Sequence, residues 1–204
     1  GLMDRDGVEL STLYLGKDIL AQCIRKKIAY LREEAKKRGF QQLLLSASAN
    51  IEVSFNADFS FPRYGYAESV PPYAGAYQFG KHYYDRPRDL KAYGEEFHCA
   101  QAIDLHPEVK MWVRNVDRQA GSFWLPTSSD KFYPDFVAML TDGRILLVEY
   151  KGKHLLSNDD TKEKRNIGEL WAEKSNGRGL FLLVSESVPE LGFERQMSAL
   201  LKKS

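Results

Sequence analysis

Residues 131–154 of the chain, KFYPDFVAMLTDGRILLVEYKGKH, predict a β-hairpin that carries charged residues at one end. Two apolar runs flank TDGR, and Asp142-Gly143 is a dipeptide typical of a two-residue hairpin turn. Asp135 begins the first strand, and Glu149 and Lys151 end the second. Counted from the turn, Asp135 and Glu149 are close to paired, so their carboxylates converge at one end of the sheet. Glu149 and Lys151 are two apart and share one face of their strand.

Two convergent carboxylates repel each other unless a positive charge lies between them, and Mg²⁺ is a cation that prefers such oxygen ligands. A metal held by Asp135 and Glu149 polarises a phosphodiester and lowers the pKa of a bound water, while Lys151 orients or deprotonates that water. The other interpretation is structural, with Asp135 capping a bend and Glu149 pairing with Lys151 at the surface. Because the charges interrupt an otherwise apolar strand, the sequence favours a bound ligand.

A third carboxylate is expected from the helix predicted over residues 91–106. Helical spacing places Glu96 on the apolar, inward face of that helix, together with Cys99, Ala100 and Ile103. An acidic side chain on an inward face needs a partner, which makes Glu96 a candidate for the metal cluster. The alternative is that Glu96 extends to solvent at the edge of the sheet.

From residue 91 onward the pattern predicts an α/β domain with the order α-β-β-β-α-β-α and a mixed sheet flanked by helices. The run RILLVEYK is apolar enough to predict a strand buried on both faces. The predicted strands are 108–116, 122–140 (interrupted by PTSSD), 144–151 and 179–186, and the later helices are 159–176 and 189–203.

Residues 1–90 are predicted to form a separate α+β appendage or the tail of a preceding domain, and residues 91–204 the main domain. The appendage begins with a helix over 16–38 that Gly39 ends. Two strand-like runs, QQLLLSAS and IEVSFNADFSF, follow this helix. The aromatic residues of the stretch 62–90 could stack on nucleic-acid bases, but with so much Pro and Gly around them we expect them to cover a core edge.

The bulk composition shows no overall basic charge of the kind typical of nucleic-acid-binding proteins. The chain has 204 residues, 43% of them hydrophobic, and a formal net charge of +1, so nucleic-acid binding would need a local basic patch. Cys23 and Cys99 are predicted to be reduced core thiols, and with no membrane span or signal peptide in the sequence we expect a cytoplasmic protein. The opening GLMDRDG reads as the start of a fragment of a longer protein.

The combination of the Glu96 helix, a strand, Pro134-Asp135 and the tripeptide Glu149-Tyr150-Lys151 resembles the PD-(D/E)XK nuclease core, which has a restriction-endonuclease-like fold. The longer string FYPDFVAML, DGRILLVEYKGKHL and DDTKEKRNIGELWA is similar to the C-terminal endonuclease domain of type III restriction enzyme Res subunits and related DEAD/DEAH-box helicase–nuclease fusions. EEFHCAQAID and EVKMWVRN are also similar to that family. The resemblance covers about residues 80–185.

The resemblance implies a metal-dependent endodeoxyribonuclease, with Asp135 and Glu149 as metal ligands and Lys151 as the catalytic lysine. It further implies that the backbone carbonyl of Tyr150 binds the Mg²⁺, for which Mn²⁺ can substitute, and that Glu96 is the helix acid. The expected partners are DNA, an upstream helicase domain of the same polypeptide and a methyltransferase or specificity subunit. This chain contains no ATP-binding loop, so ATP would act only through the upstream motor. The alternative is a non-catalytic module that binds DNA or docks a partner.

A basic group follows the proposed site and could draw DNA phosphates without reading sequence. The same charges could equally belong to a solvated helix balanced by neighbouring acids. Glu169, further along that helix, is a candidate to support the metal ligands from behind, and Trp171 is expected in the core. The members of the basic group are Lys153, His154, Lys162, Lys164 and Arg165.

Overall fold

The computed structural model describes residues 16–45, 65–152, 159–185 and 189–201, and the chain divides into two compact units at residues 47 and 48. In its described part, the first unit is a single helix, α3 (Lys17–Leu45). The predicted end of this helix at Gly39 is wrong, because α3 continues through that glycine. Residues 41–45, QQLLL, are strong helix formers that outweigh the roughly 1 kcal/mol penalty of one internal glycine.

The longer helix replaces the start of a predicted strand, and the two cysteine predictions have different outcomes. Residues 41–45, predicted to begin a strand, are helical, and the second predicted strand, over 51–61, lies outside the described residues. Cys23, predicted to be a core thiol, is exposed on α3, whereas the prediction for Cys99 is confirmed because it is buried.

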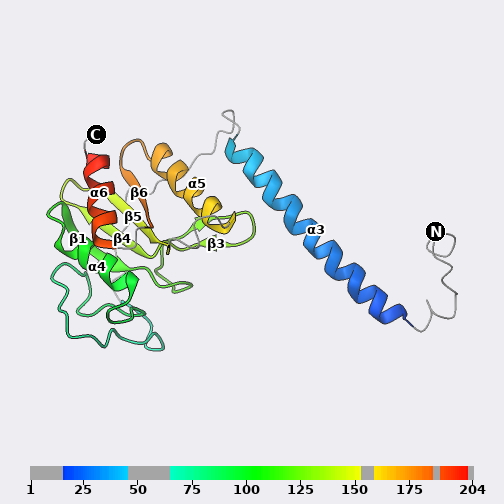
Figure 1. Ribbon diagram of the computed structural model, residues 1–204, viewed down its shortest axis with the longest axis horizontal. Helices are drawn as coiled ribbons and strands as arrows, with labels where there is room; N and C mark the ends of the chain where they lie inside the picture. The colour runs from blue at the N-terminus through cyan, green and yellow to red at the C-terminus, as the bar shows by residue number, and fades with distance from the viewer. Residues whose placement is uncertain (1–15, 46–64, 153–158, 186–188, 202–204) are drawn as a thin grey trace. The chain divides into compact units, whose positions relative to one another are not determined.

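The second unit is an α/β domain in the predicted order (Figure 1). The elements are α4 (Glu95–Leu105), β1 (Val109–Arg114), β2 (Leu125–Pro126), β3 (Lys131–Phe132), β4 (Phe136–Leu140), β5 (Ile145–Tyr150), α5 (Asp159–Lys174), β6 (Gly179–Val184) and α6 (Pro189–Leu201). The sheet has the strand order β1-β4-β5-β6, with β4 antiparallel to both β1 and β5 and with β6 parallel to β5, so it is mixed as predicted. The single interrupted strand predicted over 122–140 is instead three strands, because β2 and β3 pair with each other in a separate two-stranded hairpin and only β4 joins the main sheet.

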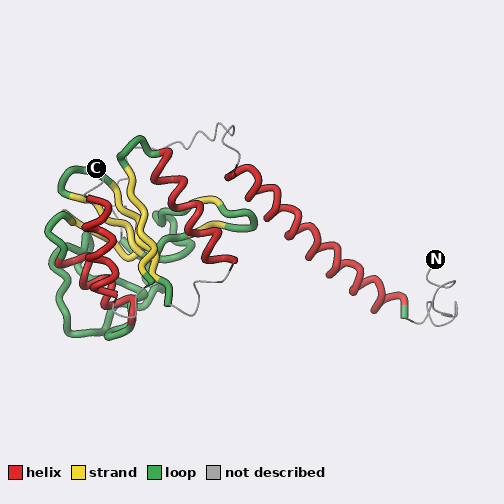
Figure 2. The backbone as a smooth tube through the Cα atoms, turned by 45° about the horizontal axis from the view of Figure 1, so that its top comes forward, coloured by secondary structure: helices red, strands yellow, loops and turns green. Residues whose placement is uncertain are grey.

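Helices cover both faces of this sheet, as the tube view shows (Figure 2). Leu146, Val148 and Tyr150 of β5 pack in the main core with residues of α4 and α6. On the other face, α5 packs so closely on β6 that a Cβ at Gly168 would lie 2.5 Å from the ring of Phe181. All six residues of β5 are buried, which confirms the prediction of a strand covered on both sides.

The compact unit begins further toward the N-terminus than the predicted boundary near residue 90. Tyr73 and Leu90 are part of the buried core, and Tyr77 and Phe79 pack against it. The ring of Tyr73 stacks on that of Phe97 in α4, with the centroids 5.8 Å apart. The expectation that aromatic residues of this stretch cover the core is therefore confirmed for these side chains.

The turn between β4 and β5 has three residues, 141–143, beyond the Leu140–Arg144 pair, rather than the two that the sequence predicted. Leu140 and Arg144 close it, since the Leu140 N–H donates to the Arg144 carbonyl oxygen at 2.8 Å. Gly143 has a φ of +89°, the left-handed conformation that the third position of such a loop requires. A two-residue turn would have placed Asp135 opposite Tyr150. The extra residue changes the register by one and places Asp135 opposite Glu149.

Candidate active site

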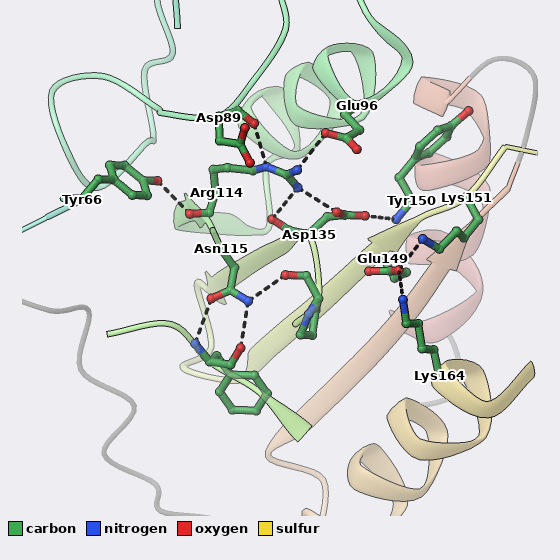
Figure 3. A network of polar contacts seen from close by, with 12 residues as sticks. Tyr66, Asp89, Glu96, Arg114, Asn115, Asp135, Glu149, Tyr150, Lys151 and Lys164 are labelled. Carbon is green, nitrogen blue, oxygen red and sulfur yellow. Dashed lines mark hydrogen bonds and ion pairs between the residues drawn. The ribbon is translucent and has the colours of Figure 1, made fainter. Parts of the chain in front are cut away.

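Asp135 and Glu149 lie opposite each other where β4 begins and β5 ends. Phe136 pairs with Val148, and one step further along the same register brings the two acidic residues together. Asp135 is held by two donors: its Oδ1 lies 2.8 Å from Nη1 of Arg114, and its Oδ2 accepts a hydrogen bond of 2.7 Å from the N–H of Tyr150 (Figure 3). The predicted convergence of two carboxylates is present in the structure, and Asp135 is fixed by both oxygens.

Glu149 is the more deeply buried of the two, with only 2% of the residue exposed. Its Oε1 lies 3.1 Å from Nζ of Lys151 and 4.0 Å from Nζ of Lys164 (Figure 3). Its Oε2 is buried without a hydrogen-bond partner among the residues that the structure describes. Burial, and after it the charge of Asp135, raises the pKa of the Glu149 carboxyl to about 8 despite the two lysines. A buried carboxylate oxygen with no donor is costly, and a cation would satisfy it.

Lys151 lies on the same side of β5 as Glu149, as their spacing predicted. Its N–H donates to the Val184 carbonyl oxygen at 2.8 Å, which fixes the backbone beyond the end of β5. Burial alone would lower the pKa of the Lys151 ammonium, but Glu149 and Asp135 raise it above its ordinary value. Lys151 is therefore a persistent cation in this arrangement, which suits orienting a water or stabilising negative charge better than removing a proton.

Glu96 does not join the two carboxylates. Its Oε2 lies 2.8 Å from Nη2 of Arg114, and its side chain remains 41% exposed at the start of α4. Partial burial raises the pKa of Glu96, and the opposing effect of Arg114 does not cancel this. In the described part of the chain, no three His, Cys, Asp or Glu side chains are grouped closely enough to hold a metal ion. The expected cluster of three carboxylates is thus reduced to the pair Asp135 and Glu149.

Arg114 is the site residue that the sequence interpretation missed. It ends β1, is 8% exposed, and its guanidinium contacts Glu96 and Asp135 and donates from Nε to the Asp89 carbonyl oxygen at 3.2 Å. The attraction of the two acids raises its pKa although burial acts in the opposite direction. A signal was present in MWVRN, since an arginine that ends an apolar strand needs a buried partner just as Glu149 does.

The adjacent Asn115 was also missed, and it organises the backbone beside Asp135. Its Nδ2 donates to the carbonyl oxygens of Phe123 at 2.9 Å and Pro134 at 2.8 Å, and its Oδ1 accepts from the Phe123 N–H at 2.8 Å. Its own N–H donates to the Asp135 carbonyl oxygen at 2.9 Å. Every one of these partners is distant in sequence, so no local pattern identifies the role.

The predicted basic group is only partly described. Lys153 and His154 lie outside the described residues. Lys162 is exposed and pairs with Asp159, and Arg165 is exposed on the same helix. Lys164 instead turns toward the carboxylates: its side chain is 22% exposed and its Nζ is 3.1 Å from Asp160 and 4.0 Å from Glu149.

The two remaining expectations for α5 have different outcomes. Trp171 is buried, as predicted. Glu169 is exposed, and the acidic residue of α5 that turns inward is Glu163, whose Oε1 accepts from the Ser128 N–H at 2.8 Å. The sequence pattern gave no reason to choose Glu163, because its partner comes from the β2–β3 hairpin.

An open pocket of about 470 Å³ lies between the start of α4 and the end of β5, beside the carboxylate pair. Arg114 and Lys151 are both in its wall, whereas Asp135, Glu149 and Lys164 are not among its lining residues. Its lining residues are Asp89, Lys91, Gly94, Glu95, Glu96, Arg114, Tyr150, Lys151 and Gly152.

The residues present fit a divalent cation in part. Glu149 offers an oxygen that has no hydrogen-bond donor in the described part of the chain, and the oxygens of Asp135, although each accepts one hydrogen bond, keep lone pairs for a further contact. Mg²⁺ commonly takes one or two protein carboxylates and completes its coordination with water, so a pair is sufficient.

Comparison with protein-family models, with curated proteins and with solved structures finds no significant match to this chain.

Proposed function

We propose that this chain is a metal-dependent endodeoxyribonuclease domain that hydrolyses DNA phosphodiester bonds. The observation that supports this most directly is Glu149, which is buried opposite Asp135, is flanked by two lysines, and has one oxygen without a donor among the described residues. A structural ion pair with Lys151 accounts for Oε1 of Glu149. It does not account for the orphaned Oε2, nor for a second carboxylate directly opposite.

In this proposal Asp135 and Glu149 hold Mg²⁺, with Mn²⁺ as a substitute, and the backbone carbonyl of Tyr150 completes the protein ligands. The bound metal would supply an activated water and stabilise charge on the phosphate oxygens. Lys151, which is already an ammonium, would orient the water and offset the charge that develops on the phosphate. Arg114 holds Asp135 at its position and Glu96 balances Arg114, so Glu96 acts on the site through Arg114.

The wider assignment rests on the resemblance to helicase–nuclease fusions. There, this domain would follow a helicase domain of the same polypeptide, which would use ATP, and would act with a methyltransferase or specificity subunit. The described residues include no helix long and apolar enough to cross a bilayer.

One observation favours the second candidate, a module that binds DNA or docks a partner without cutting. Both oxygens of Asp135 already have donors, and Glu96 is committed to Arg114, so the site is largely satisfied without metal. A purely structural network of this kind predicts no affinity for divalent cations.

The deciding experiment is plasmid cleavage by the 204-residue chain in Mg²⁺ or Mn²⁺, beside Asp135→Ala, Lys151→Ala and the control Glu169→Gln. We expect nicking that requires metal, is lost in the first two variants and persists in the control. Mg²⁺ should also raise the melting temperature of the parent chain and leave that of Asp135→Ala unchanged. DNA binding by the parent with neither cleavage nor a metal-dependent shift would overturn the nuclease assignment in favour of the binding module.

A further inference from the structure

Trp124 is a large aromatic side chain at the surface, and it directly follows Phe123, whose backbone is hydrogen-bonded to Asn115. The chain has three tryptophans, of which Trp112 and Trp171 are buried, whereas Trp124 is 44% exposed. The ammonium of Lys131 lies 3.9 Å from the centre of the Trp124 ring. This is cation–π geometry, which orients the ring and places a positive charge beside it.

The β2–β3 hairpin, which contains Lys131 and directly follows Trp124, is fixed on several sides. Asn115 clamps the backbone of Phe123, the residue before Trp124, through both its N–H and its carbonyl oxygen. At the tip, the Ser128 N–H donates to the buried Glu163 of α5. Phe132, next to Lys131, is fully buried. The backbone before Trp124 and the hairpin after it are thus both fixed to the domain.

The same clamp connects this hairpin to the proposed catalytic pair. Asn115 donates from its side chain to the Pro134 carbonyl oxygen and from its backbone to the Asp135 carbonyl oxygen (Figure 3). The support of Trp124 and the backbone of Asp135 therefore share one buried anchor. Trp124 directly follows the anchored Phe123, and Lys131 lies four residues before Asp135, so both belong to the segment that this anchor connects to the proposed catalytic pair.

We propose that Trp124 and Lys131 form a stacking platform for an unpaired nucleobase, so that the substrate is DNA with a single-stranded segment next to the cut. A flat indole offers a face to any base, and Lys131 offers a charge to the adjoining phosphate. A base inside a duplex is covered by its stacked neighbours, whereas an unpaired base exposes its face. The stated substrate rests on the proposed nuclease function, but the platform itself is a binding property that can be measured separately.

The test is a titration of tryptophan fluorescence in EDTA with oligo(dT) and with a blunt duplex of equal length. Trp124 is the exposed fluorophore, so a stacked base should quench the signal. We expect quenching by oligo(dT) at concentrations where the duplex has little effect. Trp124→Ala should weaken oligo(dT) binding, followed by anisotropy of a labelled strand, by roughly 5- to 150-fold, since one stacked base contributes about 1–3 kcal/mol.

Two further variants keep the result interpretable if Trp124→Ala is poorly folded. Trp124→Phe should retain most of the affinity and lose the fluorescence response, and Lys131→Ala should weaken binding with the ring in place. Unchanged affinity of the Trp124 variants, equal quenching by the duplex, or no quenching by any oligonucleotide overturns the platform. The fluorescence titration is made in EDTA and needs no metal. Quenching by oligo(dT), together with no plasmid cleavage in Mg²⁺, would therefore count against the proposed nuclease function and not against the platform. Metal-dependent cleavage with no single-strand preference counts against the platform alone.

Discussion

The guanidinium of Arg114 contacts Asp135 twice through one nitrogen: Nη1 lies 2.8 Å from Oδ1 of the side chain and 3.0 Å from the backbone carbonyl oxygen. Its second terminal nitrogen reaches Glu96 on α4 at 2.8 Å. One buried cation therefore ties the last residue of β1 to the residue before β4 and to the first turn of α4. The position of Asp135 depends on that cation as well as on the strand register.

Removal of Arg114 is expected to destabilise the fold strongly. Arg114→Ala removes the donor to Oδ1 of Asp135 and the donor to the Asp89 carbonyl oxygen, and breaking a buried ion pair costs about 3–5 kcal/mol in the free energy of unfolding. The matched control is Arg118→Ala, because Arg118 is 76% exposed and pairs with an exposed Asp130, so we expect a loss below about 1 kcal/mol. Urea denaturation of both variants measures this difference. Equal losses would show that the Arg114 network contributes no more than a surface pair.

Neutralising Glu149 is expected to stabilise the metal-free protein at high pH. The folded-state pKa of Glu149 is raised above the ordinary value of 4.5, so the group's contribution to stability is fully present below pH 4.5 and is lost as pH rises through about 8. Glu149→Gln removes this loss and should be more stable than the parent above pH 8 by about 1–3 kcal/mol, the cost of a buried unsatisfied group.

The measurement for Glu149 is urea denaturation at pH 4.5, 7 and 9 in EDTA, with the exposed Glu169→Gln as control. The advantage of Glu149→Gln should shrink toward the lowest pH and be absent in the control. Addition of Mg²⁺ at pH 8 should raise the stability of the parent and not that of Glu149→Gln. A variant less stable than the parent at pH 9 would mean that the ion pairs with the two lysines outweigh the burial of Glu149.

Lys164 is expected to contribute to turnover as well as to DNA binding. Its Nζ lies 4.0 Å from Glu149, and its side chain is 22% exposed. Lys164→Ala should lower kcat for plasmid nicking by roughly ten- to a hundred-fold, less than the loss of a donor in direct contact with the reacting group. The control is Lys174→Ala, an exposed lysine in the last turn of the same helix. A rise in KM with kcat unchanged would limit Lys164 to phosphate attraction.

His82 is expected to make the fold sensitive to acid. Burial lowers its pKa from 6.5 to about 4, while its Nδ1 lies 2.7 Å from the Tyr84 carbonyl oxygen and its Nε2 lies 3.0 Å from the Tyr66 hydroxyl. A depressed pKa gives stability that is present above pH 6.5 and is lost as pH falls through about 4. The loss at pH 4 is up to about 3 kcal/mol, because each pKa unit corresponds to about 1.4 kcal/mol.

Urea denaturation at pH 7.5, 5.5 and 4 measures this dependence. His82→Gln keeps polar groups in the same place but does not titrate, so its stability should fall less steeply between pH 6.5 and 4 than that of the parent. Parallel curves for the two proteins would show that the acid sensitivity arises elsewhere.

Much of the α/β domain could be predicted because its signals are local. The apolar runs over 144–151 and 179–186 were sufficient to predict β5 and β6, and the two-residue period placed Glu149 and Lys151 on one side of the strand. The boundary near residue 90 failed because Tyr73 and Leu90 reach the core from a stretch rich in turns, which has no regular period. The end of α3 at Gly39 failed because a glycine signal was outweighed by the helix formers that follow it.

By itself, the sequence determined the order of the elements and the meeting of Asp135 and Glu149 at one end of the sheet, because strand period and a short loop are properties of neighbouring residues. Only the tertiary structure decided their partners. A third residue in the loop places Asp135 directly opposite Glu149. Glu96 pairs with Arg114 and does not join the two carboxylates. Asn115 connects the segment before the β2–β3 hairpin to the backbone beside Asp135. The partners of Arg114 and Asn115 come from other segments of the chain, so no local pattern predicts them. The dipeptide Asp142-Gly143 does not by itself specify whether the loop has two residues or three.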